Sequence, residues 1–225
     1  MNVLDRFQSI LPNLCFITDD PFRVKMIAAH SLDNVEIFTE TRGQVGLIGS
    51  FNNVPIIVLS AGIGKTSTMA YLTELCLKNQ IKRVVYFGDC ITNDPSLPIG
   101  SIMLIKKAYE NGKSYDASEK MLQYTEAILR ETNIKVHNCA TTTDDHYLID
   151  KKYRISQESK VLDFTTAPIY KLNESYNVLE VLSVLTVCEN ISTNDTIGEA
   201  VRQSGGHSAI LLALQILSFD AKILQ

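Results

Sequence analysis

The sequence lacks the features that would place it in a membrane, on nucleic acid or among multidomain proteins. No apolar run approaches the roughly 20 residues needed to cross a bilayer, so we expect no membrane partner. The net charge is only −4, which excludes the basic surface typical of nucleic-acid binding. Repeats, linkers and low-complexity tracts are missing too. We therefore expect residues 1–225 to form a single domain.

Cysteines are few and are not spaced like a disulfide or metal framework. Their number is odd, no Cys-x-x-Cys pair occurs, and each lies in or beside an apolar stretch: Cys15, Cys76, Cys90, Cys139 and Cys188. This pattern favours buried thiols in a reducing compartment. Residues 1–9 include Asp5 and Arg6 and no long apolar core, so no signal peptide is expected. The sequence therefore predicts a cytoplasmic protein.

Apolar periodicity alternates between strand and helix along the whole chain, which predicts an α/β protein. The predicted strands are 14–18, 35–41, 45–51, 55–60, 82–87, 101–106, 135–141 and 178–188. The predicted helices are 21–30, 66–78, 119–131 and 198–219, the last interrupted near Gly205 and Gly206. Asp20 before Pro21 favours a helix start, and Asn52-Asn53 favours a turn.

Two predicted strands are each followed by glycine. The first leads into Gly62-Ile63-Gly64-Lys65-Thr66, and the second, 84–87, into Gly88-Asp89. Glycine turns after two such strands indicate a crevice at the carboxyl edge of the sheet, where open α/β folds bind small ligands. A P-loop would need a first glycine at Leu59, so a glycine turn close to a ligand is favoured over an ATP site.

Together with Asp20-Pro21-Phe22-Arg23 and the run 142–147 (Thr-Thr-Asp-Asp-His-Tyr), these turns resemble the nucleoside phosphorylase family, in its hexameric purine and uridine branch. The resemblance implies a three-layer α/β/α sandwich with a central mixed, partly barrel-like sheet. It also implies a small-molecule nucleoside as ligand, a homodimer or a hexamer built as a trimer of dimers, and no metal or cofactor. Phosphate would be a co-substrate only if its site is functional.

The resemblance places the phosphate site at five positions, three of which depart from the family pattern: Asp19, Arg23, Arg42, Tyr86 and Asp89. Arg23 is retained, and Arg42 matches an arginine that reaches a neighbouring subunit's site. Asp19 replaces a glycine, Tyr86 an arginine and Asp89 a serine or threonine. A carboxylate about 4 Å from a phosphate charge repels it by roughly 4 kcal/mol. These exchanges predict the loss of ordinary phosphate affinity, unless the two acids point away or bind a cation.

The ribose and base positions are changed as well. The resemblance assigns the ribose to Gln8, Gly62, Phe164 and Thr165, with Thr165 in place of a carboxylate and Asp163 beside it. Glu189 matches the general acid that protonates the purine leaving group. His146 and Tyr147 fall at the base. Asp150 and Lys152 replace the Gln and Arg with which uridine phosphorylases read uracil, so a purine is favoured.

Three functions are compatible with the sequence. The chain is a divergent phosphorylase organised around Arg23 and Arg42, or a nucleosidase that uses water with Glu189 or Asp163 as acid or base. The third possibility is a catalytically silent subunit that binds a nucleoside or forms oligomers. The sequence favours the loss of standard phosphorolysis.

Overall fold

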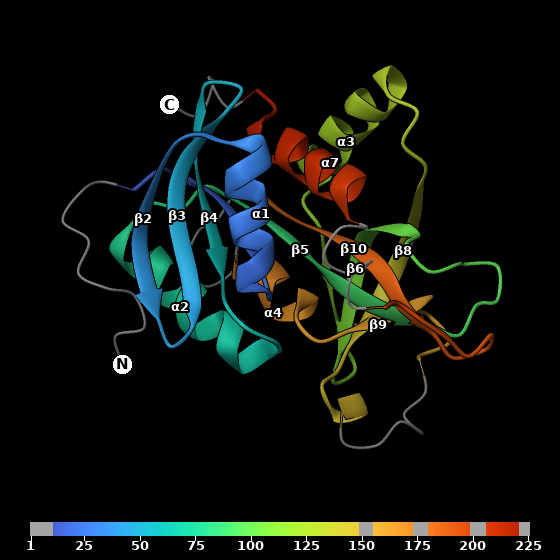
Figure 1. The fold of residues 1–225 in the computed structure, drawn as a ribbon. Coiled ribbons are helices and arrows are strands. Elements are labelled where there is room, and N and C mark those ends of the chain that lie inside the picture. Colours follow the sequence, from blue (N-terminus) through green and yellow to red (C-terminus); the bar gives the residue numbers. More distant parts are fainter. Residues whose placement is uncertain (1–10, 149–154, 173–179, 199–205, 221–225) are drawn as a thin grey trace.

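The computed structural model describes residues 11–148, 155–172, 180–198 and 206–220, and Figure 1 shows their arrangement. The strands are β1 (Leu14–Thr18), β2 (Asp33–Thr41), β3 (Gln44–Phe51), β4 (Val54–Ser60), β5 (Arg83–Thr92), β6 (Ile102–Glu110), β7 (Lys113–Asp116), β8 (Val136–Thr143), β9 (Val161–Asp163), β10 (Glu180–Asn190) and β11 (Asp195–Thr196). The helices are α1 (Pro21–Ser31), α2 (Lys65–Lys78), α3 (Glu119–Glu131), α4 (Thr166–Tyr170) and α7 (His207–Ser218), with a 3₁₀ turn η1 at His146–Leu148.

The strands of the described residues form one mixed sheet that is partly closed on itself. Their order is β11-β10-β6-β8-β9-β5-β1-β4-β3-β2, with β7 paired to β6 outside this path, and an additional pairing joins β10 to β5. That pairing closes β5, β10, β6, β8 and β9 into a small barrel, while β1 to β4 extend from it as an open sheet. β4, β1, β5 and β10 run parallel to their neighbours in this set, so their carboxyl ends meet at one edge.

The centre of the sheet is apolar on both faces because helices cover it from two sides. All five residues of β1 are buried, and β5 is buried along nearly its whole length. Phe16 and Phe87 pack with their ring centroids 6.2 Å apart. In the view of Figure 1, α1 and α7 lie in front of the sheet and α2 lies behind β2 and β3. The expected three-layer α/β/α architecture with a partly barrel-like sheet is thus confirmed.

Several elements form where their own residues predict them. The strand 14–18 and the helix 119–131 have the predicted bounds. Asp20 caps α1, because the Phe22 N–H donates to its Oδ1 at 2.8 Å and Pro21 occupies the first turn. Asn52 and Asn53 both adopt positive φ between β3 and β4, as the predicted turn requires.

The prediction of a glycine turn after residue 87 is wrong. β5 continues through Gly88 to Thr92, paired with β10 over its full length and with β9 at its end. Gly88 instead makes room on the strand: a Cβ added there would lie 2.2 Å from the Tyr86 hydroxyl oxygen. The glycine therefore serves the packing of a neighbouring ring rather than a change of chain direction.

Short elements that depend on tertiary pairing were not predicted. These are β7, β9, β11, α4 and η1. The final helix begins at His207, directly after Gly206, and residues 199–205 lie outside the described residues. No helix of the described residues is long and apolar enough to span a membrane.

Candidate functional site

A cavity of about 280 Å³ lies where the parallel strands end, at the edge where the crevice was expected. Its walls come from the ends of β1, β5 and β10, the loop after β4, η1 and the segment after β9. The lining residues are Asp19, Ile63, Tyr86, Asp89, Ile91, Tyr147, Phe164, Thr165, Cys188 and Glu189. The size and mixed lining suit a small organic ligand with a few polar groups.

One end of the cavity is acidic, and both acids bind the same arginine. Arg23 Nη1 donates to Asp19 Oδ1 at 2.8 Å, and Nη2 donates to Asp89 Oδ1 at 2.7 Å. The Arg23 side chain is only 3% exposed and lies behind the carboxylates, which are each 17% exposed and line the cavity. Thr186 Oγ1 also donates to Asp89 Oδ1, at 3.2 Å. The retained arginine is therefore already neutralised by the protein's own side chains.

Burial and charge perturb the titration of these groups. Burial raises the pKa of Asp19 to about 6; Arg23 opposes this rise and Asp89 adds to it. Burial lowers the pKa of Arg23, but the two carboxylates outweigh that effect, so the Arg23 pKa is raised overall. The guanidinium thus stays charged while Asp19 titrates in a mildly acidic range.

Tyr86 lines the cavity from β5, the strand that also carries Asp89. Its ring lies over Gly88, and its hydroxyl is hydrogen-bonded to the side chain of Thr165. Burial, together with the nearby carboxylates of Asp19 and Asp163, raises the Tyr86 pKa well above its ordinary value. Tyr86 therefore supplies a neutral hydroxyl where the family pattern has a charged guanidinium.

Glu189, which matches the family's general acid, lines the same cavity. The Tyr147 hydroxyl donates to Glu189 Oε1 at 2.9 Å, and burial together with this bond raises the Tyr147 pKa to about 12. The register between β10 and β5 shifts between Val187 and Glu189, which leaves Cys188 as the extra residue of a bulge. The bulge explains why consecutive residues, Cys188 and Glu189, both reach the cavity.

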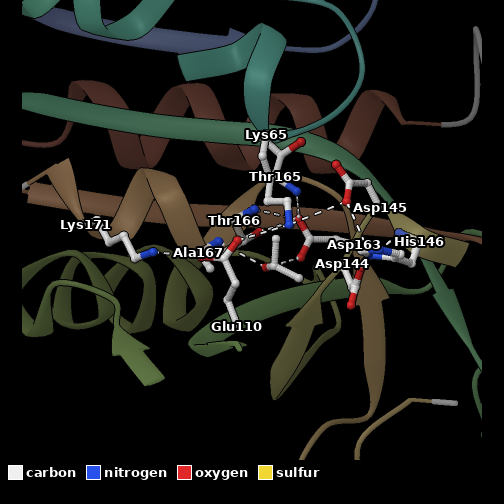
Figure 2. A network of polar contacts seen from close by, with 11 residues as sticks. Lys65, Glu110, Asp144, Asp145, His146, Asp163, Thr165, Thr166, Ala167 and Lys171 are labelled. Atoms are coloured by element: carbon white, nitrogen blue, oxygen red, sulfur yellow. Dashed lines mark hydrogen bonds and ion pairs between the residues drawn. The ribbon is translucent and has the colours of Figure 1, made fainter. Parts of the chain in front are cut away.

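Asp163 is not among the residues that line the cavity. It accepts hydrogen bonds from several neighbouring residues (Figure 2). Its Oδ1 accepts from the hydroxyls of Thr141 at 3.1 Å and Thr143 at 2.8 Å. Its Oδ2 accepts from the N–H groups of Thr165 and Thr166, at 2.8 and 2.7 Å, and from the Thr166 hydroxyl at 2.8 Å. This carboxylate, which the resemblance offers as a catalytic group, is 1% exposed and holds five hydrogen-bond donors in place.

Several predicted positions are not brought to the cavity within one chain. Arg42 is exposed at the tip of the β2–β3 hairpin, and the cavity meets Ile63 rather than Gly62. The His146 side chain is 73% exposed, with Nδ1 2.9 Å from Asp144 Oδ1, and it does not line the cavity. Gln8, Asp150 and Lys152 lie outside the described residues.

Lys65, at the start of α2, forms ion pairs with acidic side chains (Figure 2). Its Nζ lies 3.1 Å from Glu110 Oε1 and 3.5 Å from Asp145 Oδ1, and Lys171 Nζ lies 2.7 Å from Glu110 Oε2. This network ties together the segments that carry Ile63, Tyr147 and Thr165. Among the described residues, Asp144, Asp145 and His146 also form a potential metal-ligating cluster.

Sequence reasoning missed the apolar part of the lining. Ile63, Ile91 and Cys188 each contribute to the cavity wall. Ile63 directly follows the glycine that was singled out, and Cys188 directly precedes Glu189, so their neighbours were the available signal. Ile91 carried none, because the strand that holds it was expected to end earlier.

Similarity to known proteins agrees with this geometry. The phosphorylase superfamily profile matches residues 13–216. A DeoD-type purine nucleoside phosphorylase of Buchnera aphidicola subsp. Schizaphis graminum is 28% identical over 222 residues, with 90% of this chain and 92% of the relative covered. The DeoD-type enzyme of a Thermoanaerobacter species is 29% identical over 213 residues, with 88% and 91% covered.

Solved structures share the fold at lower identity. Purine nucleoside phosphorylase from Toxoplasma gondii, in complex with immucillin-H, superposes with a TM-score of 0.81 at 16% identity, covering 96% of this chain and 93% of the other. Uridine phosphorylase from Vibrio fischeri gives 0.74 at 20% identity, covering 92% and 91%. Since the superfamily profile spans most of the sequence, the chain belongs to the phosphorylase superfamily as a nucleoside phosphorylase-like member.

Proposed function

We propose that the protein binds a purine nucleoside in this cavity and cleaves its N-glycosidic bond with water instead of phosphate. The observation that carries the proposal is the pairing of Arg23 with both Asp19 and Asp89. An incoming phosphate would meet two carboxylates, and the guanidinium that should attract it is already bound. The purine preference is supported by the names of the DeoD-type relatives.

Glu189 in the cavity lining supports the departure of a base. Glu189 reaches the cavity from the β10 bulge and is oriented by the Tyr147 hydroxyl. A protonated Glu189 can donate to the purine nitrogen as the bond to C1′ of the sugar breaks, and the electron pair of that bond goes to the nitrogen. Water forms the new bond to C1′ and loses its proton to solvent, which returns a proton to Glu189.

Asp163 and Thr165 favour a second candidate, a nucleoside-binding protein without turnover. In the family pattern a carboxylate grips the ribose hydroxyls, and here that position is Thr165. Asp163, the nearest acid, is held by five donors and is absent from the cavity wall. A weaker hold on the ribose reduces the binding energy available to distort the sugar toward its transition state.

The exposed position of Arg42 bears on assembly. The side chain lies at the tip of a hairpin and outside the cavity of its own chain. This placement supports a homodimer or larger assembly in which Arg42 approaches a neighbouring cavity, as the family resemblance implies. Sedimentation of the wild type and of Arg42→Ala, each with and without nucleoside, tests this.

Release of free base from a panel of purine and pyrimidine nucleosides tests the proposed function. Each nucleoside is incubated with and without phosphate, and its binding is measured by calorimetry. Release of purine base that is independent of phosphate supports hydrolysis, and Glu189→Gln should slow this release strongly while leaving the nucleoside bound. Release that requires phosphate refutes the proposal. Binding without release supports the second candidate.

A further inference from the structure

The acidic end of the cavity carries a net negative charge that belongs to the protein. One guanidinium and two carboxylates sum to −1 when all are ionised (+1 − 2). A ligand in the cavity contacts this charge directly, because the carboxylates line the cavity while the Arg23 side chain is buried. A group entering this end therefore approaches oxygen atoms before it approaches the guanidinium.

Cleavage of an N-glycosidic bond builds positive charge on the sugar. In ordinary phosphorolysis the bound phosphate supplies the opposing negative charge. We propose that Asp19 and Asp89 form a built-in anionic subsite that replaces phosphate and selects ligands with a positively charged sugar ring. The ligand class is a cationic nucleoside analogue, bound without phosphate. This inference rests on the proposed function, since it assumes that the sugar of a nucleoside lies beside the acidic end.

The subsite is held in place before any ligand arrives. Asp19 follows β1, Asp89 lies on β5 and Arg23 lies on α1, and Thr186 on β10 adds a hydrogen bond to Asp89. Charges fixed by several elements need little reorganisation when a ligand cation forms, which is the condition under which electrostatic stabilisation is strongest.

The charge of the subsite depends on pH through Asp19. The ionisable groups around Asp19 are Asp20, which caps α1, Arg23 on α1, and Asp89 and Tyr86 on β5. Glu189 of β10 lines the same cavity. Because burial raises the Asp19 pKa to about 6, the carboxylate is ionised above that pH and protonated below it. Affinity for a cation should therefore be high at neutral pH and fall in mild acid.

The experiment compares a purine nucleoside with an analogue whose ring oxygen is replaced by a quaternary nitrogen, which stays charged at every pH. Binding is measured in phosphate-free buffer of constant ionic strength, near pH 7.5 and near pH 5. At the higher pH we expect the charged analogue to bind roughly tenfold more tightly than the neutral nucleoside. At the lower pH this preference should be smaller. Added phosphate should not strengthen binding.

Variants test whether this preference depends on Asp19 and Asp89. Asp19→Asn should reduce the preference for the charged analogue and flatten its pH dependence, and Asp89→Asn should reduce the preference. Asp116→Asn removes the same charge from a side chain that is 68% exposed on β7, and should leave the preference unchanged. If a variant fails to fold, the pH series on the wild-type protein still tests the proposal.

The outcomes distinguish failure of the anionic subsite from failure of the proposed hydrolytic function. Equal affinity for neutral and charged compounds, or a preference that appears only with phosphate, overturns the inference even if hydrolysis occurs. A charged-analogue preference in a protein that releases no base supports the inference and refutes the hydrolytic function.

Discussion

Removing the two acids that hold Arg23 should convert the cavity into an anion site. The double variant Asp19→Gly with Asp89→Ser restores the residue types that the family pattern has at these positions. In the wild type both Arg23 Nη1 and Nη2 donate to carboxylates, so an incoming phosphate would compete with two negative charges for the guanidinium. In the variant the same guanidinium is buried and lacks these two partners.

Coulomb's law gives the approximate size of the change. At a separation of about 4 Å and an effective dielectric near 20, each charge pair contributes about 4 kcal/mol. A unit negative charge in the wild-type site meets two repulsions and one attraction, a net penalty of about 4 kcal/mol; in the variant the attraction remains, a gain of about 4 kcal/mol. If solvent screening halves this difference of about 8 kcal/mol, phosphate affinity still rises roughly a thousandfold.

Two assays measure this effect at constant ionic strength. Calorimetry should detect phosphate binding to the variant and none to the wild type at the same concentrations. Thermal unfolding should show a less stable variant without phosphate, because a buried charge that loses its partners costs about 3–5 kcal/mol. Phosphate should then raise the Tm of the variant far more than that of the wild type.

A matched control removes two charges elsewhere. Asp116→Ser with Asp195→Ser lowers the net negative charge equally at exposed positions and should bind no phosphate. The reasoning about Arg23 is refuted if the wild type binds phosphate as well as the variant does, or if the surface control gains the same affinity.

Three further predictions concern residues around the cavity. Glu189→Gln should lower the rate of base release at least about a hundredfold and change nucleoside affinity little, because it removes a proton donor; comparison of kcat with Kd checks this. Asp163→Asn should destabilise the fold by about 3 kcal/mol in urea unfolding, since an amide cannot accept from all five donors. A loss below about 0.5 kcal/mol would contradict that structural role. Gly88→Ala should weaken nucleoside binding by displacing the Tyr86 ring, and a Tyr86→Ala background should remove this effect in a double-mutant cycle.

Local chemistry made much of the fold predictable. The Asp20-Pro21 helix start, the Asn52-Asn53 turn and the apolar strand 14–18 depend on neighbouring residues, and all were confirmed. The failure at Gly88 has the opposite cause. Sequence alone favours a turn at a glycine that follows an apolar strand. Here the pairing of β5 with β10 and β9 makes the strand continue through Gly88.

The chain by itself determined which charges are available: it retains Arg23, adds Asp19 and Asp89, and exchanges an arginine for Tyr86. Only the tertiary structure decided how they combine. Asp89 is 66 positions from Arg23, and the two meet because β1 and β5 are parallel neighbours whose carboxyl ends share an edge. The structure likewise enclosed Asp163 among hydroxyl and amide donors while leaving Glu189 on the cavity wall. Hydrogen-bond partners depend on the directions of side chains from separate strands, and those directions are set by packing rather than by the order of residues.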